Sequence, residues 1–195
     1  MKKLAVLLSA VLALVLMTET AQAQQQGTIE IGVDNALSFN LVQAFTVESV
    51  ELAESRTDID FFLPAFYWRF GYFASPMFSI EIPVGFLLAS TGNSGGTDYM
   101  LDAGLNVLYN MESGLFLGVN GVLSYMRDDP GGDEESSSTT RYGFGGQVGY
   151  RVPFIADNIR FRTALVYNYL LKNEDDFIPA AHRIAAQFGM SLMTK

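Results

Sequence analysis

Charged side chains recur at alternate positions in several segments of this chain. Arg69 and Glu81, for example, each stand in a row of small or polar residues that alternates with a row of bulky apolar residues. Carboxylates and guanidinium groups on one face can form ion pairs, and they can also line a charged pore or a gate for small solutes. The alternation predicts that nine such side chains share one face: Glu30, Asp34, Arg69, Glu81, Asp102, Arg151, Arg160, Arg162 and Arg183.

Carboxylates also cluster between the alternating segments. Residues 128–135 and 174–176 form acidic runs. Four more carboxylates lie before residue 59: Glu48, Glu51, Glu54 and Asp58. Clustered carboxylates suit Ca²⁺ or Mg²⁺, but their spacing here matches no EF-hand loop. The sequence therefore predicts soluble acidic loops and no dedicated metal or cofactor site, although divalent cations could bridge these loops to lipid phosphates.

The two-residue period predicts β-strands, whose successive side chains point to opposite faces. The predicted strands are residues 28–37, 59–72, 78–89, 98–109, 115–126, 141–152, 159–171 and 181–193. The connections at 73–77, 110–114 and 153–158 are short, those at 38–58, 127–140 and 172–180 are long and polar or acidic, and 90–97 is intermediate and Gly-rich. The sequence thus predicts an all-β fold: an eight-stranded antiparallel up-and-down barrel.

The bulky apolar row is predicted to lie on the outside of this barrel. After residue 77, Phe78, Ile80 and Ile82 alternate with Ser79 and Glu81. An eight-stranded barrel is only wide enough inside for packed side chains, so row after row of Phe and Tyr would overfill it. The polar row also lacks lysine, which a solvated strand face normally uses. A bulky apolar exterior requires lipid, so the predicted barrel is transmembrane.

The aromatic residues support this orientation. Rings with one polar atom favour the two membrane–water interfaces, and most tyrosines fall on the apolar row near the strand ends. Tyr67 is the exception and is predicted to point inwards. The predicted aromatic girdle comprises Trp68, Tyr72, Tyr99, Tyr109, Tyr125, Tyr142, Tyr150 and Tyr169.

The start of the chain is typical of a secretory signal peptide. Lys2 and Lys3 precede an apolar run at 4–17, and Ala21-Gln22-Ala23 is a small-x-small cleavage site. We expect cleavage after Ala23, leaving 24–195 as one barrel domain. No later apolar run reaches the roughly 18 residues of a membrane helix, and without such a helix only a closed barrel can satisfy its backbone in lipid.

Composition excludes two classes of chemistry. The chain has no cysteine, which rules out disulfides and thiol catalysis. Its net charge of −9 becomes −10 once Lys2, Lys3 and Glu19 are removed with the signal peptide. An acidic chain of this kind argues against nucleic acid as a partner, because phosphates need a basic face.

Over the whole mature chain, these features resemble the small eight-stranded outer-membrane β-barrel proteins of Gram-negative bacteria. The resemblance rests on the signal peptide, the strand count, the loop asymmetry and the girdle. It implies short periplasmic turns, longer extracellular loops, and a bilayer containing lipopolysaccharide as the surroundings. It also implies insertion by the outer-membrane assembly machinery, which in that family reads a terminal aromatic residue. Here Phe188, Met190 and Leu192 keep the outward alternation, but no terminal Phe follows.

The charged inner row has two interpretations, a pore or a salt-bridge plug, and the narrow interior favours the plug. Pairing Tyr72 with Phe78 predicts that Arg69 lies directly opposite Glu81, and closure lets Glu30 and Arg162 share the same part of the lumen. The apolar segment 39–52 is expected to extend the first hairpin, to fold over the mouth or to pack on the rim.

Three roles are compatible with this sequence. The leading hypothesis is a non-enzymatic outer-membrane barrel with a structural, adhesive or protective role carried by acidic surface loops and a charged, plugged lumen. The alternative is transport of small solutes, hydrophobic ones in particular, by a lateral or lumenal path. The third is a lipid A-modifying enzyme, since barrels of that kind use a histidine with a serine and a carboxylate. His182, the single histidine, is predicted to face outwards with no serine within three positions, so catalysis is not expected.

Overall fold

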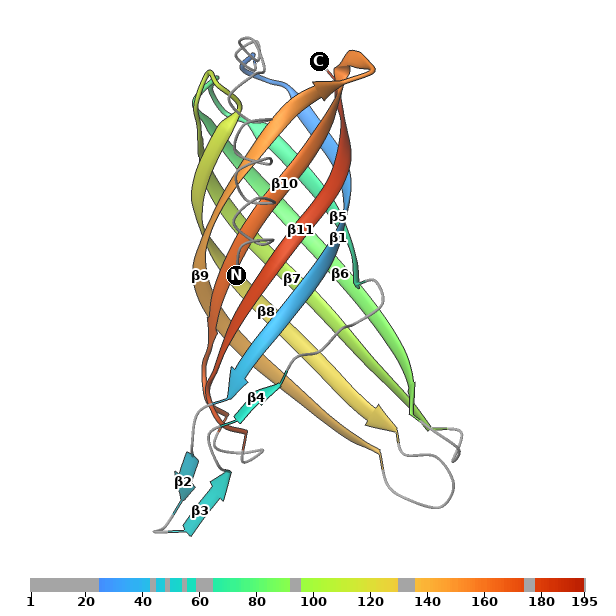
Figure 1. The fold of residues 1–195 in the computed structure, drawn as a ribbon, viewed down its shortest axis with the longest axis vertical. Coiled ribbons are helices and arrows are strands. Elements are labelled where there is room, and N and C mark those ends of the chain that lie inside the picture. Colours follow the sequence, from blue (N-terminus) through green and yellow to red (C-terminus); the bar gives the residue numbers. More distant parts are fainter. Residues whose placement is uncertain are drawn as a thin grey trace, which may run out of the picture.

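The structure is a computed structural model that describes residues 25–42, 45–47, 50–53, 56–58, 65–91, 96–129, 136–173 and 178–194. Within these ranges the long elements are antiparallel strands (Figure 1). They are β1 (Ile29–Val42), β5 (Ala65–Phe73), β6 (Phe78–Thr91), β7 (Gly96–Asn110), β8 (Leu115–Asp129), β9 (Ser137–Phe154), β10 (Ala156–Leu170) and β11 (Ala181–Thr194). Each pairs with its sequence neighbour, and β11 pairs back onto β1, so these eight strands form a closed barrel. The predicted fold is confirmed.

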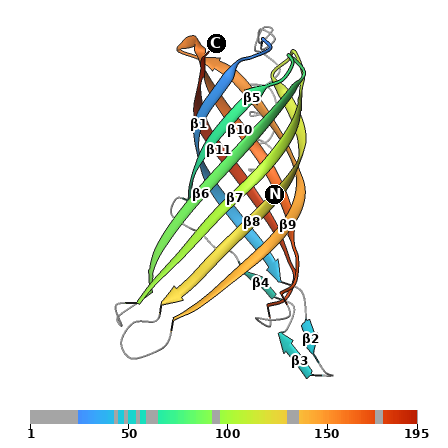
Figure 2. The ribbon, with the colours of Figure 1, turned by 180° about the vertical axis from the view of Figure 1, so that it is seen from behind.

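The two ends of the barrel differ (Figures 1 and 2). The connections 74–77, 111–114 and the single residue Ile155 lie at one end, which we call the short-turn end. The opposite, long-loop end carries the hairpin of β2 (Phe45–Val47) and β3 (Val50–Ala53), and β4 (Arg56–Asp58), which pairs with the end of β1. The apolar segment 39–52 therefore continues β1 and contributes this hairpin. No helix long and apolar enough to cross a membrane occurs in the described ranges.

Exposure follows the two-residue period. On the outward row of β6, Ile80 and Ile82 are exposed, whereas Ser79 and Glu81 on the inward row are buried. The large apolar residues lie outside and the polar residues inside, the reverse of a soluble protein. Several strands extend further towards the long-loop end than predicted, for example β8 to Asp129. The added residues of β8 and β9 are polar on both rows, so they lack the apolar alternation on which the prediction rested, whereas β1 extends into the apolar segment 39–42.

The β5–β6 hairpin differs from the predicted register by two residues. Tyr72 pairs with Ile80 and Gly71 with Glu81, so Arg69 lies opposite Pro83 and not opposite Glu81. The cause is the turn: Phe73 remains in β5, and Ser75 bonds to Phe78 through both its backbone and its hydroxyl oxygen, which accepts from the Phe78 amide at 3.0 Å. Because the slip is an even number, every side chain keeps its predicted face.

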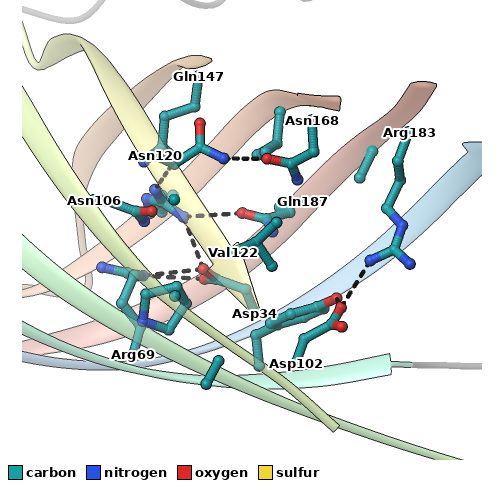
Figure 3. Close-up of a pocket in the computed structure, with 18 residues that line it drawn as sticks. Asp34, Arg69, Asp102, Asn106, Asn120, Val122, Gln147, Asn168, Arg183 and Gln187 are labelled. Atoms are coloured by element: carbon teal, nitrogen blue, oxygen red, sulfur yellow. Dashed lines mark hydrogen bonds and ion pairs between the residues drawn. The ribbon is translucent and has the colours of Figure 1, made fainter. Parts of the chain in front are cut away.

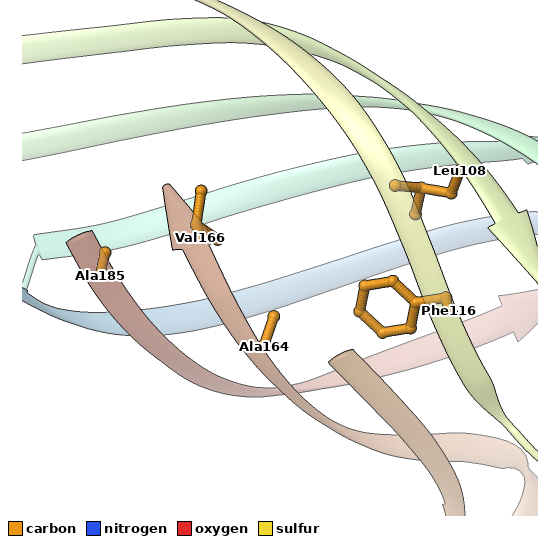
Figure 4. Packing of buried hydrophobic residues seen from close by; sticks show 5 residues of the cluster. All are labelled: Leu108, Phe116, Ala164, Val166 and Ala185. Atoms are coloured by element: carbon orange, nitrogen blue, oxygen red, sulfur yellow. The ribbon is translucent and has the colours of Figure 1, made fainter. Parts of the chain in front are cut away.

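A small apolar cluster fills part of the lumen. Its members are Leu108, Phe116, Ala164, Val166 and Ala185 (Figure 4). Glycine makes room for the largest of them: a Cβ added to Gly149 would lie 2.8 Å from Phe116 Cε1, closer than real contacts allow. The inward row was predicted as polar and small, and this cluster is the main departure from that prediction.

The β9–β10 turn carries a strained residue. Ile155 has a φ of 65° and is 88% exposed, a left-handed conformation that is costly for a β-branched side chain. We expect Ile155→Asn to stabilise the barrel by about 1 kcal/mol, because asparagine tolerates this conformation and no packing is lost. Urea unfolding in lipid vesicles measures the change. Ile155→Val is the matched control and should give no gain; equal effects of both variants would contradict the strain.

Candidate functional site

Arg69 lies at the centre of a buried charge cluster in the lumen. Its Nε donates to Asp34 Oδ2 at 3.0 Å, and its Nη1 bonds to Glu30 and lies 3.5 Å from Glu81 Oε1. β1 supplies two of these carboxylates at positions four apart on the inward row, while neighbouring β5 supplies the arginine. All four side chains are almost completely removed from solvent.

Two further arginines complete the cluster from the opposite wall. Arg162 on β10 reaches Asp34 Oδ2 at 2.8 Å and Glu81 Oε2 at 3.4 Å. Arg151 on β9 bonds to Glu81 and lies 3.4 Å from Glu30 Oε2. Three guanidinium groups and three carboxylates therefore neutralise one another across the barrel. We call these six residues the ion-pair layer: Glu30, Asp34, Arg69, Glu81, Arg151 and Arg162.

Amide side chains satisfy further groups of this layer. Gln147 Oε1 accepts from Arg162 at 3.0 Å, and Asn110 Oδ1 accepts from Arg151. Buried charges are tolerated only when they are paired and hydrogen-bonded, and removing one partner is strongly unfavourable. The layer thus ties together strands that are distant in sequence.

Aromatic rings pack directly beneath two of these arginines. The guanidinium carbons of Arg151 and Arg162 lie 4.3 Å and 4.7 Å from the centroid of the Phe116 ring, and Arg151 lies 5.7 Å from that of Phe73. Phe73, Phe116 and Leu108 are fully buried, and we call them the apolar layer. Cation–π attraction favours this arrangement. The inward parity of Phe116 and Leu108 in the sequence is the signal that would have revealed it.

A separate ion pair lies on the long-loop side of the ion-pair layer, because Arg183 pairs with Asn40, six residues beyond Asp34 along β1. Figure 3 shows this pair. Arg183 Nη1 donates to Asp102 Oδ2 at 2.9 Å, and the Tyr67 hydroxyl donates to the same oxygen at 2.8 Å. Tyr67 therefore points inwards. Between this pair and Arg69 lies a cavity of about 50 Å³, room for a few water molecules and little else.

Polar groups line this cavity. Asn120 donates its amide to Asn168 (Figure 3). Gln147 Nε2 and Arg162 Nε are buried and find no hydrogen-bond partner among the described residues, and water in the cavity can satisfy such atoms. Of the nine predicted charges, six form the ion-pair layer and two form the Asp102–Arg183 pair. Arg160 is also buried, but it makes no ion pair with any residue in the described ranges.

The predicted girdle residues do not share one environment. Trp68, Tyr72, Tyr109 and Tyr142 are exposed on the outward face. Partly buried positions are occupied by Tyr99, Tyr125 and Tyr169. Tyr150 is buried, with only 8% of its surface accessible. It pairs with Leu115 on β8 and with Thr163 on β10.

His182 lies on the outward row, as predicted, and contacts tyrosines. Its Nδ1 is 2.7 Å from the Tyr167 hydroxyl, and its ring centroid is 5.1 Å from that of Tyr169. These contacts do not make a nucleophile–base–acid arrangement of the kind that lipid hydrolysis requires.

The predicted acidic loops fall only in part within the described residues. Glu48, Glu54, 130–135 and 174–177 lie outside the described ranges, as do 59–64 and the predicted signal peptide. Glu51 and Asp58 fall in β3 and β4. The described residues include no group of three or more His, Asp or Glu that could hold a metal ion.

A closed antiparallel barrel with an apolar exterior, a charged interior and unequal ends defines the class of eight-stranded transmembrane barrels found in outer membranes. Solved structures share this fold. The attachment invasion locus protein Ail of Yersinia pestis aligns with a TM-score of 0.58 at 12% identity, over 87% of this chain and 100% of that one.

Two more structures resemble the chain to a similar degree. Ail in complex with the heparin analogue sucrose octasulfate gives a TM-score of 0.54 at 13% identity, over 87% of this chain and 100% of that one. Neisserial surface protein A gives 0.52 at 14% identity, over 86% and 99%. No protein-family profile and no curated protein sequence matches the chain. At these identities the likeness establishes the fold.

Proposed function

We propose that the mature chain, after removal of 1–23, is an integral outer-membrane protein without enzymatic activity. Its role is structural, adhesive or protective, and the acidic loops of the long-loop end carry it. One observation supports this most directly: the lumen is filled at two successive levels, by the ion-pair layer and by the apolar layer. A barrel whose lumen is closed to solutes can act only through its outer surface and its loops.

Two of the similar structures support a surface role. Ail is named for attachment and invasion, and one of its structures holds a sulfated ligand. We extend to this chain only the idea that loops on such a barrel can meet external partners. Divalent cations are a second proposed partner of the acidic loops, because carboxylate oxygens are their preferred ligands.

Transport and catalysis are less well supported. The cavity beside Asp34 and Asp102 has a volume of only about 50 Å³, far below that of pockets that bind small-molecule solutes. His182 faces outwards and bonds to Tyr167. We therefore propose neither a solute pathway nor a lipid-modifying reaction.

Planar-bilayer recording tests the closed lumen. The wild-type barrel should give no conductance steps. Arg151→Ala combined with Phe116→Ala removes one side chain from each layer and should conduct, because the guanidinium no longer covers the space that the ring vacates. Stepwise conductance from the wild-type barrel would overturn the proposal.

Shortening the β8–β9 loop tests the surface role. In the variant, Asn-Gly replaces residues 130–135. Cells that express this variant should attach less to matrix-coated surfaces, or survive less well in serum, than cells that express the wild-type protein. The replacement should leave heat-modifiable migration of the barrel on gels unchanged. Glu112→Gln, an exposed acidic residue at the short-turn end, is the matched control. If the loop variant behaves like this control in both assays, the loop does not carry the role.

A further inference from the structure

Arg160 carries the unmatched charge among the buried residues that the structure describes. Five arginines and four carboxylates are buried in these ranges. All of them except Arg160 are joined in the ion-pair layer or in the Asp102–Arg183 pair. Arg160 is only 6% exposed, and its Nε finds no hydrogen-bond partner among the described residues. A guanidinium in this position is costly, because burial removes its hydration and no counter-ion replaces it.

This arginine lies at the short-turn end of the lumen. On β10 it stands two positions nearer to that end than Arg162 of the ion-pair layer. The next inward residue towards the turn, Asn158, is exposed. A small solute can therefore approach Arg160 from the aqueous side of this end without crossing the ion-pair layer.

Other donors without partners lie next to Arg160. Ser191 on β11 pairs directly with it, is 3% exposed, and has a hydroxyl with no hydrogen-bond partner among the described residues. On the other side, β9 carries Arg151 two residues from Pro153, which pairs with Arg160. Arg151 Nε is buried and also finds no hydrogen-bond partner in the described ranges. Three adjacent strands thus bring unsatisfied donors to one part of the lumen.

The carboxylates near Arg160 do not neutralise it. The charges of Asp157 and Glu30 act on its guanidinium, but neither residue forms an ion pair with it. Glu30 is already engaged by Arg69 and Arg151. Asp157 is exposed, so water and salt screen its charge. The acidic runs 128–135 and 174–176 belong to the connections of the opposite end.

We propose that Arg160 and Ser191 bind one small oxyanion, a phosphate or a carboxylate group, which enters the lumen from the short-turn end. The anion supplies the missing negative charge and accepts hydrogen bonds from the guanidinium and from the Ser191 hydroxyl. A guanidinium presents its donors in a planar fork that matches both kinds of oxyanion. Arginine is always protonated in proteins, so the site needs no change of protonation to hold an anion. It is separate from the outer wall and from the long loops.

The Nε–H group of Arg160 can be followed by NMR. The full mature barrel in dodecyl maltoside micelles is titrated with inorganic phosphate and, separately, with acetate, while sodium chloride keeps the ionic strength constant. Arg160→Gln assigns the signal by its loss. We expect a saturable shift of this signal with at least one probe, and the probe that binds more tightly identifies the ligand group. No saturable shift with either probe overturns the proposal.

Arg160→Gln tests the charge, and Arg127→Gln is the matched control. Calorimetric titration with the better probe should show an affinity about tenfold lower or weaker still for Arg160→Gln, the effect of losing a hydrogen bond to a charged group. Ser191→Ala should weaken binding about fivefold, the effect of one ordinary hydrogen bond. Arg127, at the end of β8 near the long loops, should be replaceable without effect. Unchanged affinity in Arg160→Gln would overturn the proposal.

Urea unfolding separates an anion site from a purely structural arginine. A ligand that binds only the folded barrel raises the urea midpoint. The better probe should raise the midpoint of the wild type and of Arg127→Gln, but not that of Arg160→Gln, whose folding is checked by heat-modifiable migration. Without an oxyanion, Arg160→Gln should unfold at the same urea concentration as the wild type or at a higher one, because it removes an uncompensated charge.

Two results of this measurement would contradict the site. An equal rise in all three proteins would reflect the general stabilisation of folded proteins by such salts and would overturn the proposal. A lower midpoint of Arg160→Gln without an oxyanion would show that Arg160 already has a stabilising partner within the chain, and it would overturn the proposal as well.

Discussion

Arg69→Ala should destabilise the barrel by about 3–5 kcal/mol, because it leaves buried carboxylates without their central partner. Arg69 contacts Glu30, Asp34 and Glu81 at once. Glu81 keeps Arg151 and Arg162, and Asp34 keeps Arg162 at 2.8 Å. Glu30 keeps only the longer contact with Arg151 at 3.4 Å, so it loses most. Urea unfolding in lipid vesicles measures the loss. Glu112→Ala, which removes an exposed turn carboxylate, is the control and should cost less than about 0.5 kcal/mol.

The double change Arg69→Ala with Glu30→Ala should recover part of this loss. Two arginines and two carboxylates then remain in the ion-pair layer, so neither charge of the deleted pair is stranded. A coupling free energy of about 1–3 kcal/mol is expected for groups in direct contact. Strict additivity of the two single changes would show that Arg69 and Glu30 do not meet.

Val119→Arg should cost about 2–4 kcal/mol in a bilayer, the penalty for arginine on the lipid face near the membrane midplane. Val119 is 65% exposed and stands midway between Leu115 and Leu123 on the outward row of β8. The penalty arises because the guanidinium must be transferred into hydrocarbon, although no packed contact is lost.

The control for this change is an arginine substitution at another exposed apolar residue, one that lies at the end of the barrel and not near the membrane midplane. Ile155→Arg, at the short-turn end, should alter the unfolding free energy by no more than about 1 kcal/mol, as expected near the interface. Unfolding of both variants in lipid vesicles gives the comparison. Equal costs would mean that Val119 does not face lipid.

The fold could be predicted from the sequence because one periodic signal runs through it. The outward rows of β6 and β8 are continuous and bulky, and only lipid accommodates them, so strand number, face and closure follow together. The exact pairing could not be predicted in the same way. The β5–β6 hairpin includes Phe73 and closes through Ser75, and alternation alone fits either register, since a shift of two residues preserves both faces.

One contact of the candidate site was predicted: Arg69 lies 3.5 Å from Glu81, although the two residues are not directly opposite each other. Inward parity identified Arg69, Glu30 and Glu81, whereas the main partners of Arg69 come from β1, far away in the sequence. The apolar layer was missed because Phe116 and Leu108 were assigned no role beside a polar row. Tyr150 shows a second limit of the alternating pattern. The pattern predicts which face a side chain lies on, but neighbouring side chains decide whether it is exposed, and Tyr150 is buried.

Fluorescence quenching of Trp68 tests the inside–outside assignment most directly. Trp68 is the single tryptophan, lies between Phe66 and Phe70 on the outward row, and is 55% exposed. In vesicles with bromine on the acyl chains, its emission should be strongly quenched, while acrylamide in the water should have little effect. Efficient quenching by acrylamide together with no response to brominated lipid would place Trp68 in water and contradict the lipid-facing barrel.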